Sequence, residues 1–389
     1  MGRIFVMCIG VVAMIASACA PAAAPASPTA QPKAAAPAAG EQPKAAAPAA
    51  GSQPAAASAS ASAEWEKVVE AAKKEGKVTI YGQFDQAVYE QYIAAFNSKY
   101  PGIEVEVAFS TGPQAAEKIR TEVAAGKVQG DMWRSFTDPA LLMARDGILE
   151  QWRSPSLVNE RDKFAFLKSD EDEGGFLSNV AAQVSGIMIN TNVVKEADAP
   201  TSWYDLADPK YKGKILWSDP RRPGGGQSMT WAMTEKDGQK AVDFFKIFST
   251  QDLVYEVAAP KMAEDVARGE YGIGAPSQWT SYLPKQAPQT KFIQPKEGLY
   301  YSIANAVIPK GAPHPNAAKL WIEWETSKEG QQLKADLGYE VAIRTDVTTK
   351  ETWLRLDTAG PWAGIPFADR LTKQADMNER VKGIYTFAN

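Results

Sequence analysis

The sequence predicts an α/β protein in which helices cover a β-sheet, and two patterns lead to this class. From Glu64 onward, short runs rich in β-branched and aromatic residues alternate with longer stretches whose apolar residues recur at helical spacing. Strands and helices in that rhythm form sheets with covering helices. Ligands of such sheets bind where loops leave the carboxyl ends of the strands, so these loops are where we look for function.

Gly and Pro residues, together with apolar spacing, bound the individual elements. Gly76 and the pair Pro101-Gly102 end two amphipathic helices, and the turn Ser110–Pro113 separates a strand of alternating polarity from a third helix. The expected helices are 64–75, 85–100, 114–125, 315–327 and 329–337, and the expected strands are 77–81, 103–109 and a short one that begins at 130.

The N-terminus has the features of a secretory signal. A basic residue precedes an uncharged apolar run from Ile4 to Ile15, which is too short to span a bilayer as a mature helix. The stretch Ala16-Ser17-Ala18-Cys19 then resembles the lipobox of bacterial lipoproteins. That resemblance implies a signal peptide over 1–18, cleavage before Cys19 and a lipid on this cysteine. An ordinary signal peptide cut nearby, with the cysteine incidental, is the alternative.

Residues 19–62 are predicted to form a disordered tether. They consist almost entirely of Ala, Pro, Ser, Gly, Gln and Lys, and a nine-residue pattern at 32–40 returns at 43–51. A segment without large apolar side chains cannot offset the entropy lost on ordering, and prolines keep it extended. We therefore expect an extracytoplasmic body, lipid-anchored by this arm to the outer face of the cell membrane, in the periplasm or at the cell surface.

Composition argues against several functional classes. The chain has 389 residues, a formal net charge of −4 and interspersed acids and bases, which gives nucleic-acid binding little support. Its two cysteines are Cys8, in the signal, and Cys19, so the body has no thiol for catalysis or for a Cys/His metal site. The single histidine, His314, lies in a Pro-His-Pro turn, and no Gly-x-Ser-x-Gly elbow is present. No later apolar run reaches the roughly 20 residues of a transmembrane helix.

Several short motifs of the body follow one another in the order found in a known family. They are Glu75–Tyr81, Phe96–Pro101, Gly130-Asp131, Ser185–Thr191, Pro200–Leu206, Lys210–Ile215, Asp219-Pro220, Pro309–Ala318 and Glu329–Gln331. Together they resemble the extracellular solute-binding proteins of bacterial ABC importers, and the most similar subgroup is that of the ferric-iron-binding proteins. Each motif is weak alone, but the set covers nearly all of residues 64–350.

This resemblance implies the type II periplasmic-binding-protein fold. The fold has two α/β lobes, each a mixed sheet flanked by helices. Two hinge strands join the lobes, which close on a ligand that binds between them. We expect lobe 1 at 63–187 and 300–389, and lobe 2 at 188–299. The crossing strands are expected near Ile187–Asn190 and Pro295–Ser302.

Loops after strands supply the predicted ligand-binding residues. The loop at 221–228 is rich in glycines that allow close approach, and it precedes a helix whose N-terminus favours negative charge. In the ferric-binding proteins that this chain resembles, the corresponding loop holds an anion, and the resemblance implies the same role here. Hydroxyls and backbone N–H groups also precede a helix at 110–112. The predicted residues are Gln83, Phe84, Ser110, Thr111, Gly112, Arg134, Ser135, Arg221, Gly225, Gly226, Gln227, Ser228, Trp279, Tyr282 and Tyr339.

One loop departs from the iron-binding subgroup. The resemblance implies a tyrosine pair where Trp279-Thr280 stand, and a His and a Glu near Phe84 and Phe136. Indole and phenyl groups bind no metal. Tyr300-Tyr301 is a true pair, but neighbours in a strand face opposite ways and cannot both hold one ion. We therefore predict no metal ligands and no cofactor.

The predicted ligand is a small organic solute, most simply an anion. Aromatic residues of the site supply apolar area, and its arginines hold a carboxylate or phosphate head. Two alternatives remain open at this stage. One is a cationic head with Asp85 or Asp138 as counter-charge, and the other is a ferric ion held by a non-standard ligand set.

The predicted function is that of the substrate-binding component of an ABC importer. Such a protein is not an enzyme: it would act as a monomer, shut its lobes on the ligand and deliver it to a two-subunit permease. The alternatives of another class are a secreted hydrolase with a pair of catalytic carboxylates, since acids are many, and a structural lipoprotein.

Overall fold

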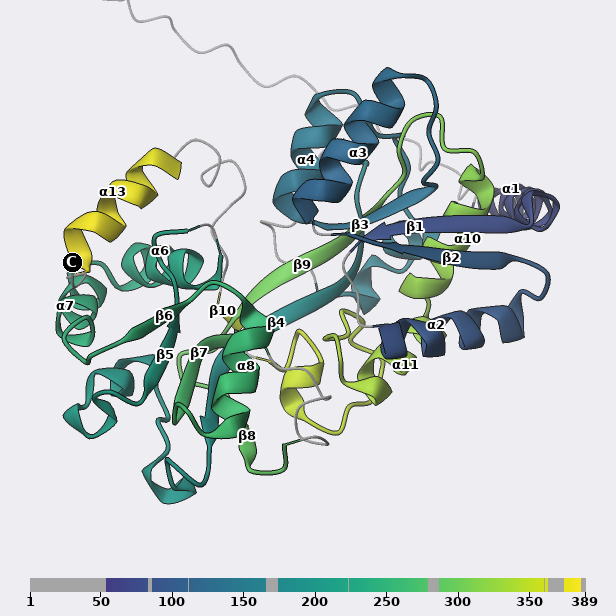
Figure 1. Ribbon diagram of the computed structural model, residues 1–389. Coiled ribbons are helices and arrows are strands. Elements are labelled where there is room, and N and C mark those ends of the chain that lie inside the picture. Colours follow the sequence, from purple (N-terminus) through teal and green to yellow (C-terminus); the bar gives the residue numbers. More distant parts are fainter. Residues whose placement is uncertain are drawn as a thin grey trace, which may run out of the picture. The chain divides into compact units, whose positions relative to one another are not determined.

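One continuous sheet organises the described part of the chain (Figure 1). The computed structural model describes residues 54–82, 86–110, 112–165, 174–222, 224–278, 287–359, 361–362 and 374–385. Along the sheet the strand order is β2-β1-β3-β9-β4-β7-β5-β6, while β10 pairs with β9 and β8 with β4. The strands are β1 Lys77–Gly82, β2 Glu104–Phe109, β3 Met132–Phe136, β4 Ser178–Asn190, β5 Ile215–Ser218, β6 Val254–Glu256, β7 Ile273–Gln278, β8 Thr290–Ile293, β9 Leu299–Val307 and β10 Pro361–Trp362. The predicted α/β class is confirmed.

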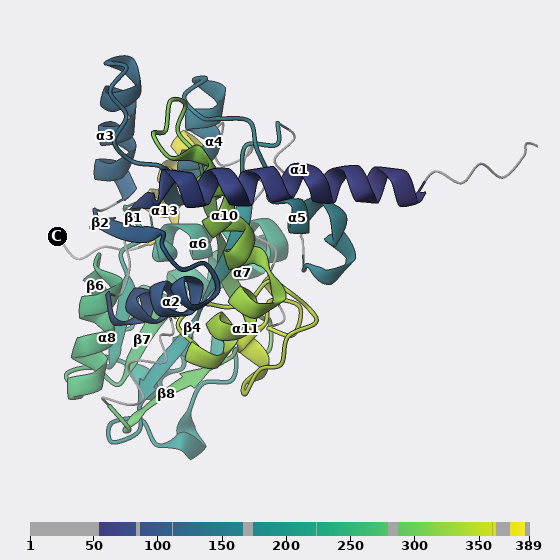
Figure 2. The same ribbon diagram turned by 90° about the vertical axis from the view of Figure 1, so that its right-hand side faces the viewer.

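Helices cover both faces of the two ends of this sheet. Those near β1 to β3 are α1 Pro54–Glu75, α2 Gln86–Lys99, α3 Gly112–Ala124, α4 Thr137–Arg145, α5 Pro155–Asn159, α10 Pro315–Thr326 and α11 Lys328–Leu337. Those near β5 to β7 are α6 Gly225–Asp237, α7 Gln239–Phe248, α8 Ala259–Arg268 and α13 Gln374–Ile384. Figure 2 turns the same ribbon by 90°, and the two views agree that α1 lies next to α10, with which it packs.

Lobe 1 has a core on each face of the parallel strands β1, β2 and β3. On one face Val78 and Ile80 of β1 meet the aromatic side chains of α2 and α10, with Trp321 fully buried. On the other face Tyr81 and Trp133 pack with apolar residues of α3 and α4. A parallel strand that is buried on both faces reads as an apolar run rather than an alternating one, as β1 does.

Lobe 2 repeats this arrangement around β5, β6 and β7. Ile273 and Trp217 pack with Phe245 and its neighbours on α7, while α8 covers the other face through Val266. β5 pairs in parallel with both β6 and β7. The two lobes therefore have separate hydrophobic cores, each large enough to hold its own end of the sheet.

Strands β4 and β9 connect the two lobes. They pair antiparallel from Ser178 opposite Ala306 to Ser185 opposite Tyr300, after which β4 takes β7 and β8 as partners. β9 in turn pairs with β3 of lobe 1. The expected pair of crossing strands is present, and β4 changes partner just before the expected position at Ile187–Asn190. Because the crossing strands pair with each other, the sheets of the lobes form one continuous ladder.

Two boundaries differ from those predicted. Helix α1 begins at Pro54, so residues 54–62 are helical, although they were assigned to the tether. Alanine is the strongest helix former and proline is tolerated in a first turn, so an Ala/Ser-rich segment continues an amphipathic helix readily. The signal peptide, Cys19 and the tether up to residue 53 lie outside the described residues.

The second difference is the C-terminal helix α13. Val381, Ile384 and Tyr385 contribute to the core around β5 and β7, although residues 300–389 were assigned to lobe 1. The hydroxyls of Thr230 and Tyr385 lie 2.8 Å apart within hydrogen-bond distance, so α13 is fixed to α6. Spacing alone gives no information on which of two cores a terminal helix joins.

The motifs that carried the family resemblance hold lobe 1 together. The Glu75 carboxylate accepts hydrogen bonds from the backbone N–H groups of Asn316 and Ala317 and so caps α10. Fully buried Asp131 accepts one from the backbone of Thr79 at 2.7 Å and one from that of His314 at 2.7 Å. His314 is structural, as predicted.

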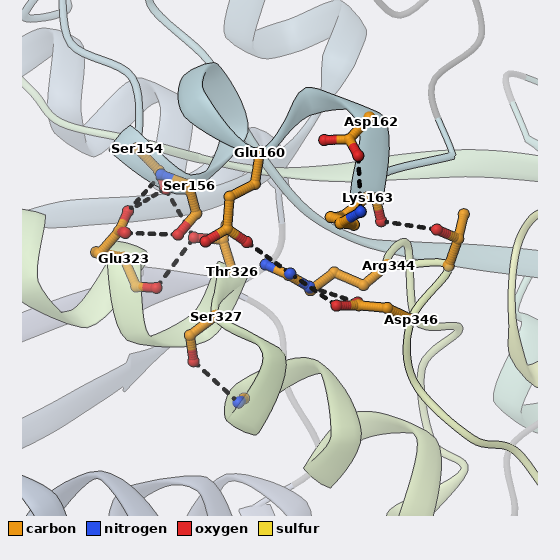
Figure 3. A network of polar contacts seen from close by, with 12 residues as sticks. Ser154, Ser156, Glu160, Asp162, Lys163, Glu323, Thr326, Ser327, Arg344 and Asp346 are labelled. Atoms are coloured by element: carbon orange, nitrogen blue, oxygen red, sulfur yellow. Dashed lines mark hydrogen bonds and ion pairs between the residues drawn. The ribbon is translucent and has the colours of Figure 1, made fainter. Parts of the chain in front are cut away.

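A further polar network ties the α5 region to α10 and to the segment after α11. Figure 3 shows the Glu323 carboxylate accepting from Ser154 and Ser156, while the Arg344 guanidinium lies between Glu160 and Asp346. All of these partners belong to lobe 1. The network therefore stabilises the lobe, and we assign it no ligand.

Candidate functional site

The carboxyl ends of β1, β2 and β3 meet at one edge of lobe 1, next to the crossing strand β9. Two phenylalanines lie there, Phe109 at the end of β2 and Phe136 at the end of β3, and they are 51% and 41% exposed. Helices α3 and α4 begin directly after them. In a parallel sheet this is the edge at which ligands bind, and exposed rings at this edge offer an apolar contact surface.

The predicted residues of this edge are only partly within the described chain. Gln83, Phe84 and Thr111 lie outside the described residues. Ser110 and Gly112 are half-buried at the edge, and the backbone N–H of Ser110 continues the ladder to Gly82 at 2.9 Å. Ser110 and Gly112 therefore lie at this edge, and their ligand contact stays a prediction.

Arg134 and Ser135 face opposite sides of the sheet. Ser135 is buried opposite Asn305 of β9, and its hydroxyl donates to the carbonyl of Phe136. Arg134 points to the other face, where its Nη2 lies 2.6 Å from Oε2 of Glu340 and its Nε lies 3.2 Å from Oε1 of Glu325. Since neighbours in a strand alternate, these two side chains do not share one ligand face.

Arg134 belongs to a buried network of two cations and two carboxylates. Lys334 Nζ lies 2.6 Å from Glu325 Oε1 and 3.5 Å from Glu340 Oε2, and each of the four side chains is at most 6% exposed. Burial alone would raise the pKa of Glu340, but the charges of Arg134 and Lys334 outweigh it and hold this pKa below its usual value. The charge of Arg134 is thus compensated inside lobe 1.

The matching edge of lobe 2 lies at the start of α6. Gly226 donates its N–H to Oγ of Ser218 at 3.0 Å, and a Cβ at Gly226 would lie 1.8 Å from the carbonyl oxygen of Ser218. Only glycine fits at that position. The N–H of Gly225 has no acceptor among the described residues, as is usual in the first turn of a helix, and it is available to an anion.

Two arginines precede this helix. Arg221 forms a two-point pair with Asp219, with distances of 2.8 Å from Nε and 2.9 Å from Nη2, and it lies over the Tyr255 ring. Burial would raise the pKa of Asp219, but the hydrogen bonds from Arg221 lower it below its usual value. Arg222 is exposed, and its guanidinium forms no ion pair with any residue that the structure describes.

The remaining predicted residues are distributed over several environments. Gln227 is buried and donates from Nε2 to Asn378 of α13 at 2.9 Å, while Ser228 is half-buried in the first turn of α6. Tyr339 is half-buried beside the crossing strand β4. Trp279 and Tyr282 lie outside the described residues.

The tyrosine pair behaves as alternation predicts. Tyr301 is buried in a cluster on one face of β9, and Tyr300 packs against the core of lobe 2 on the other. Within the described ranges, no group of three or more His, Cys, Asp or Glu side chains is placed to hold a metal ion. None of the described helices combines the length and the apolar character needed to cross a membrane.

Three residues at or beside the carboxyl-end edges of the two lobes were not identified from the sequence. Phe109 was read only as part of a strand, and Gln183 and Gln278 were not considered. Gln183 is a single amide within the mostly apolar run Val180–Ile189, and such an interruption in a buried strand is a signal that could have identified it. Gln278 ends β7 directly before the predicted Trp279.

The fold and these edges define a two-lobed periplasmic binding protein. The family model described as bacterial extracellular solute-binding protein matches residues 91–357, and the chain belongs to this family. It thus provides the solute-binding component of an ABC importer, a class that binds small ligands and interacts with permease subunits.

Three similar proteins illustrate the range of ligands. A putative 2-aminoethylphosphonate-binding periplasmic protein from Salmonella typhi is 24% identical over 196 residues, 48% of this chain and 58% of that protein. The periplasmic binding protein AfuA from Actinobacillus pleuropneumoniae, with exogenous fructose-6-phosphate bound, has a TM-score of 0.61 and 25% identity over 80% of this chain and 99% of its own. Iron-bound HitA from Pseudomonas aeruginosa has a TM-score of 0.62 and 18% identity over 77% of this chain and 99% of its own, which is a likeness of fold alone.

Proposed function

We propose that this protein captures a small organic anion whose charged head binds at the start of α6. The observation that carries the proposal is the exposed guanidinium of Arg222, next to the N-terminus of a 13-residue helix. An arginine fork and first-turn N–H groups both favour carboxylate, phosphonate or phosphate. Among the similar proteins, one is named as a putative 2-aminoethylphosphonate-binding protein and another has fructose-6-phosphate bound, which supports an anionic head.

The test is a binding screen by thermal shift, followed by titration calorimetry. The panel contains phosphonates, organic acids, polyamines, sugars and ferric citrate. We expect stabilisation by phosphonates or organic acids, and a loss of about tenfold or more in affinity for Arg222→Met, because one charge-assisted hydrogen bond is worth roughly 1.5–3 kcal/mol. Arg268→Met is the control, since Arg268 is an exposed arginine that precedes β7 at the other edge of lobe 2. Stabilisation by a ferric salt alone, with a visible charge-transfer colour, would contradict the proposal.

We further propose that the mature protein is a monomer anchored by a lipid on Cys19, on the outer side of the cell membrane. The support is the stretch Ala16–Cys19 followed by a Pro-rich arm. Replacing Cys19 by Ser is expected to release the protein from the membrane fraction and to abolish labelling with a fatty-acid analogue. Unchanged fractionation and labelling would refute the anchor but leave ligand capture untouched.

We also propose that the protein binds its ligand without changing it chemically. The relatives are binding proteins rather than enzymes, and hinge closure needs no covalent step. After incubation with excess protein and denaturation, we expect every bound ligand to be recovered unchanged by mass spectrometry. Recovery of a hydrolysed product in place of the ligand would instead favour the carboxylate-dependent hydrolase.

A further inference from the structure

The two crossing strands carry different chemistry on their two faces. On one face Ala182 and Val184 lie opposite Ile303 and Tyr301, and all four are buried in one hydrophobic cluster. On the other face Gln183 lies opposite Ser302, and both side chains are only half-buried. An apolar face is explained by packing, whereas a polar face at the middle of a crossing strand needs another explanation.

The strand register extends this polar face in both directions. Gln278 of β7 lies opposite Ser185, two residues from Gln183, and Phe136 of β3 lies opposite Ala304, two residues from Ser302. Residues that are directly opposite, or two apart in one strand, point to the same face. Phe136, Gln183, Gln278 and Ser302 therefore share one face of the sheet, and we call these four the floor residues.

The polar groups of the floor are not used by the fold. The side chains of Gln183, Gln278 and Ser302 make no hydrogen bond to any residue in the described ranges. A cavity of about 30 Å³, room for one or two water molecules, lies where β4 changes partner, and Gln183, Gln278 and Tyr339 are among its lining residues. Each carboxamide offers two donors and one acceptor oxygen to a bound group.

The floor carries no net charge. Glu340 also lines the cavity, but its carboxylate is paired with Arg134 at 2.6 Å and with Lys334 at 3.5 Å. Neutral amides and a hydroxyl suit groups that both donate and accept hydrogen bonds, such as hydroxyls. A desolvated ammonium group would instead require a carboxylate or an aromatic cage to replace its hydration.

The floor residues lie close enough to the proposed anion position to contact the same ligand. A Cβ built on Gly225, at the start of α6, would lie 3.2 Å from Cγ of Pro276, and Pro276 is two residues before Gln278 in β7. Two residues of a strand span about 7 Å. A tail of three carbons from the anionic head covers most of that distance.

We infer that the floor residues bind the uncharged, hydrogen-bonding end of the ligand, so that the preferred solute is an organic anion with a hydroxylated tail rather than an aminated one. This inference rests on the anion proposed above. It adds a second recognition element, on the crossing strands, which determines selectivity among ligands that share one head group.

Three ligands of equal length test the inference: 3-hydroxypropylphosphonate, 3-aminopropylphosphonate and propylphosphonate. By calorimetry at pH 7 we expect wild type to bind the hydroxyl compound about tenfold more tightly than the propyl compound and the amine most weakly, because one hydrogen bond is worth roughly one such factor. Gln183→Ala and Gln278→Ala should each reduce the hydroxyl preference at unchanged affinity for propylphosphonate. Gln183→Glu should reverse the preference towards the amine.

The control is Gln129→Ala, an exposed glutamine just before the start of β3, at the other edge of lobe 1. It should leave all three affinities unchanged, and circular dichroism confirms that each variant is folded. If Gln183 and Gln278 variants keep the wild-type order of affinities, the floor inference is refuted while the anion proposal stands. If wild type binds no organic anion and binds another class of solute instead, the proposed head-group site is wrong and the inference falls with it.

Discussion

Replacing Arg134 by Met separates a structural role from a ligand-binding one. In the network of four buried charges, the change leaves Lys334 alone with the carboxylates of Glu325 and Glu340, all at most 2% exposed. Removing one partner of a buried ion pair costs about 3–5 kcal/mol, because the charge left behind is not compensated. The free energy of unfolding of a domain is about 5–15 kcal/mol, so the variant should lose a large part of its stability.

Urea unfolding followed by tryptophan fluorescence measures this loss at pH 7. The double variant Arg134→Met/Glu340→Gln restores charge balance, and we expect it to regain at least 1 kcal/mol relative to the sum of the single variants, as interacting pairs do. If the two changes are additive, or if Arg134→Met costs less than about 1 kcal/mol, the network does not hold lobe 1 as we argue. If Arg134→Met lost ligand affinity but kept full stability, Arg134 would be a ligand-binding residue rather than a structural one.

The same network has a defined pH dependence. The pKa of Glu340 is lowered from its usual 4.5, so its stabilising contribution is complete above that value and is lost as the pH falls through the lower, native pKa. In Arg134→Met one carboxylate is in excess and takes up a proton more easily. We therefore expect the stability difference between wild type and variant to narrow from pH 7 to pH 5, and a constant difference would contradict this explanation.

Three further changes should act through packing and hydrogen bonds. Gly226→Ala brings a Cβ to 1.8 Å from the Ser218 carbonyl oxygen and should shift or unfold the start of α6, which thermal unfolding and loss of anion binding would detect; unchanged values would contradict the close approach. Asp131→Asn weakens the acceptors for Thr79 and His314 and should cost about 1–3 kcal/mol in urea unfolding with ligand affinity kept. Truncation after residue 373 removes apolar side chains of α13 from the core of lobe 2 and should lower the unfolding midpoint of that lobe, and an unchanged midpoint would mean that α13 is not part of this core.

Local patterns sufficed for the elements and for the crossing strands. Period-two and helical spacing, with Gly76 and Pro101-Gly102 as ends, placed the first helices and strands within a few residues of their positions. The same patterns failed where the outcome depends on distant packing. The clearest case is α13, which joins lobe 2 through contacts with α6 and α7 that no spacing encodes. The helix over 54–62 was missed for a local reason, because its Ala-rich composition was assigned to the tether although alanine favours a helix.

The candidate site was likewise predictable from the sequence only in part. The start of α6 was predictable, because a glycine-rich turn before a helix has a local signature. The roles of the arginines were not, since Glu340 lies 206 residues from Arg134 in the sequence, whereas Asp219 lies two residues from Arg221. Only the fold reveals that Arg134 is neutralised and that Arg222 is exposed. The polar floor residues Gln183, Gln278 and Ser302 were missed for a related reason, because their common face depends on the register of three strands.

The continuous ladder has a consequence for selectivity. Because β4 pairs with β9 on one side and with β7 and β8 farther on, the backbone beneath the floor is held by hydrogen bonds from both lobes. Groups on such a backbone shift less during a hinge motion than the loops at the lobe edges, which move with their own lobe. Gln278 of β7 and the start of α6 both belong to lobe 2, so the distance between the proposed head-group position and Gln278 stays almost unchanged when the lobes close. On this argument the substitution at Gln278 should change the dissociation of ligand from the open form, so its effect on selectivity should persist in conditions that keep the lobes apart.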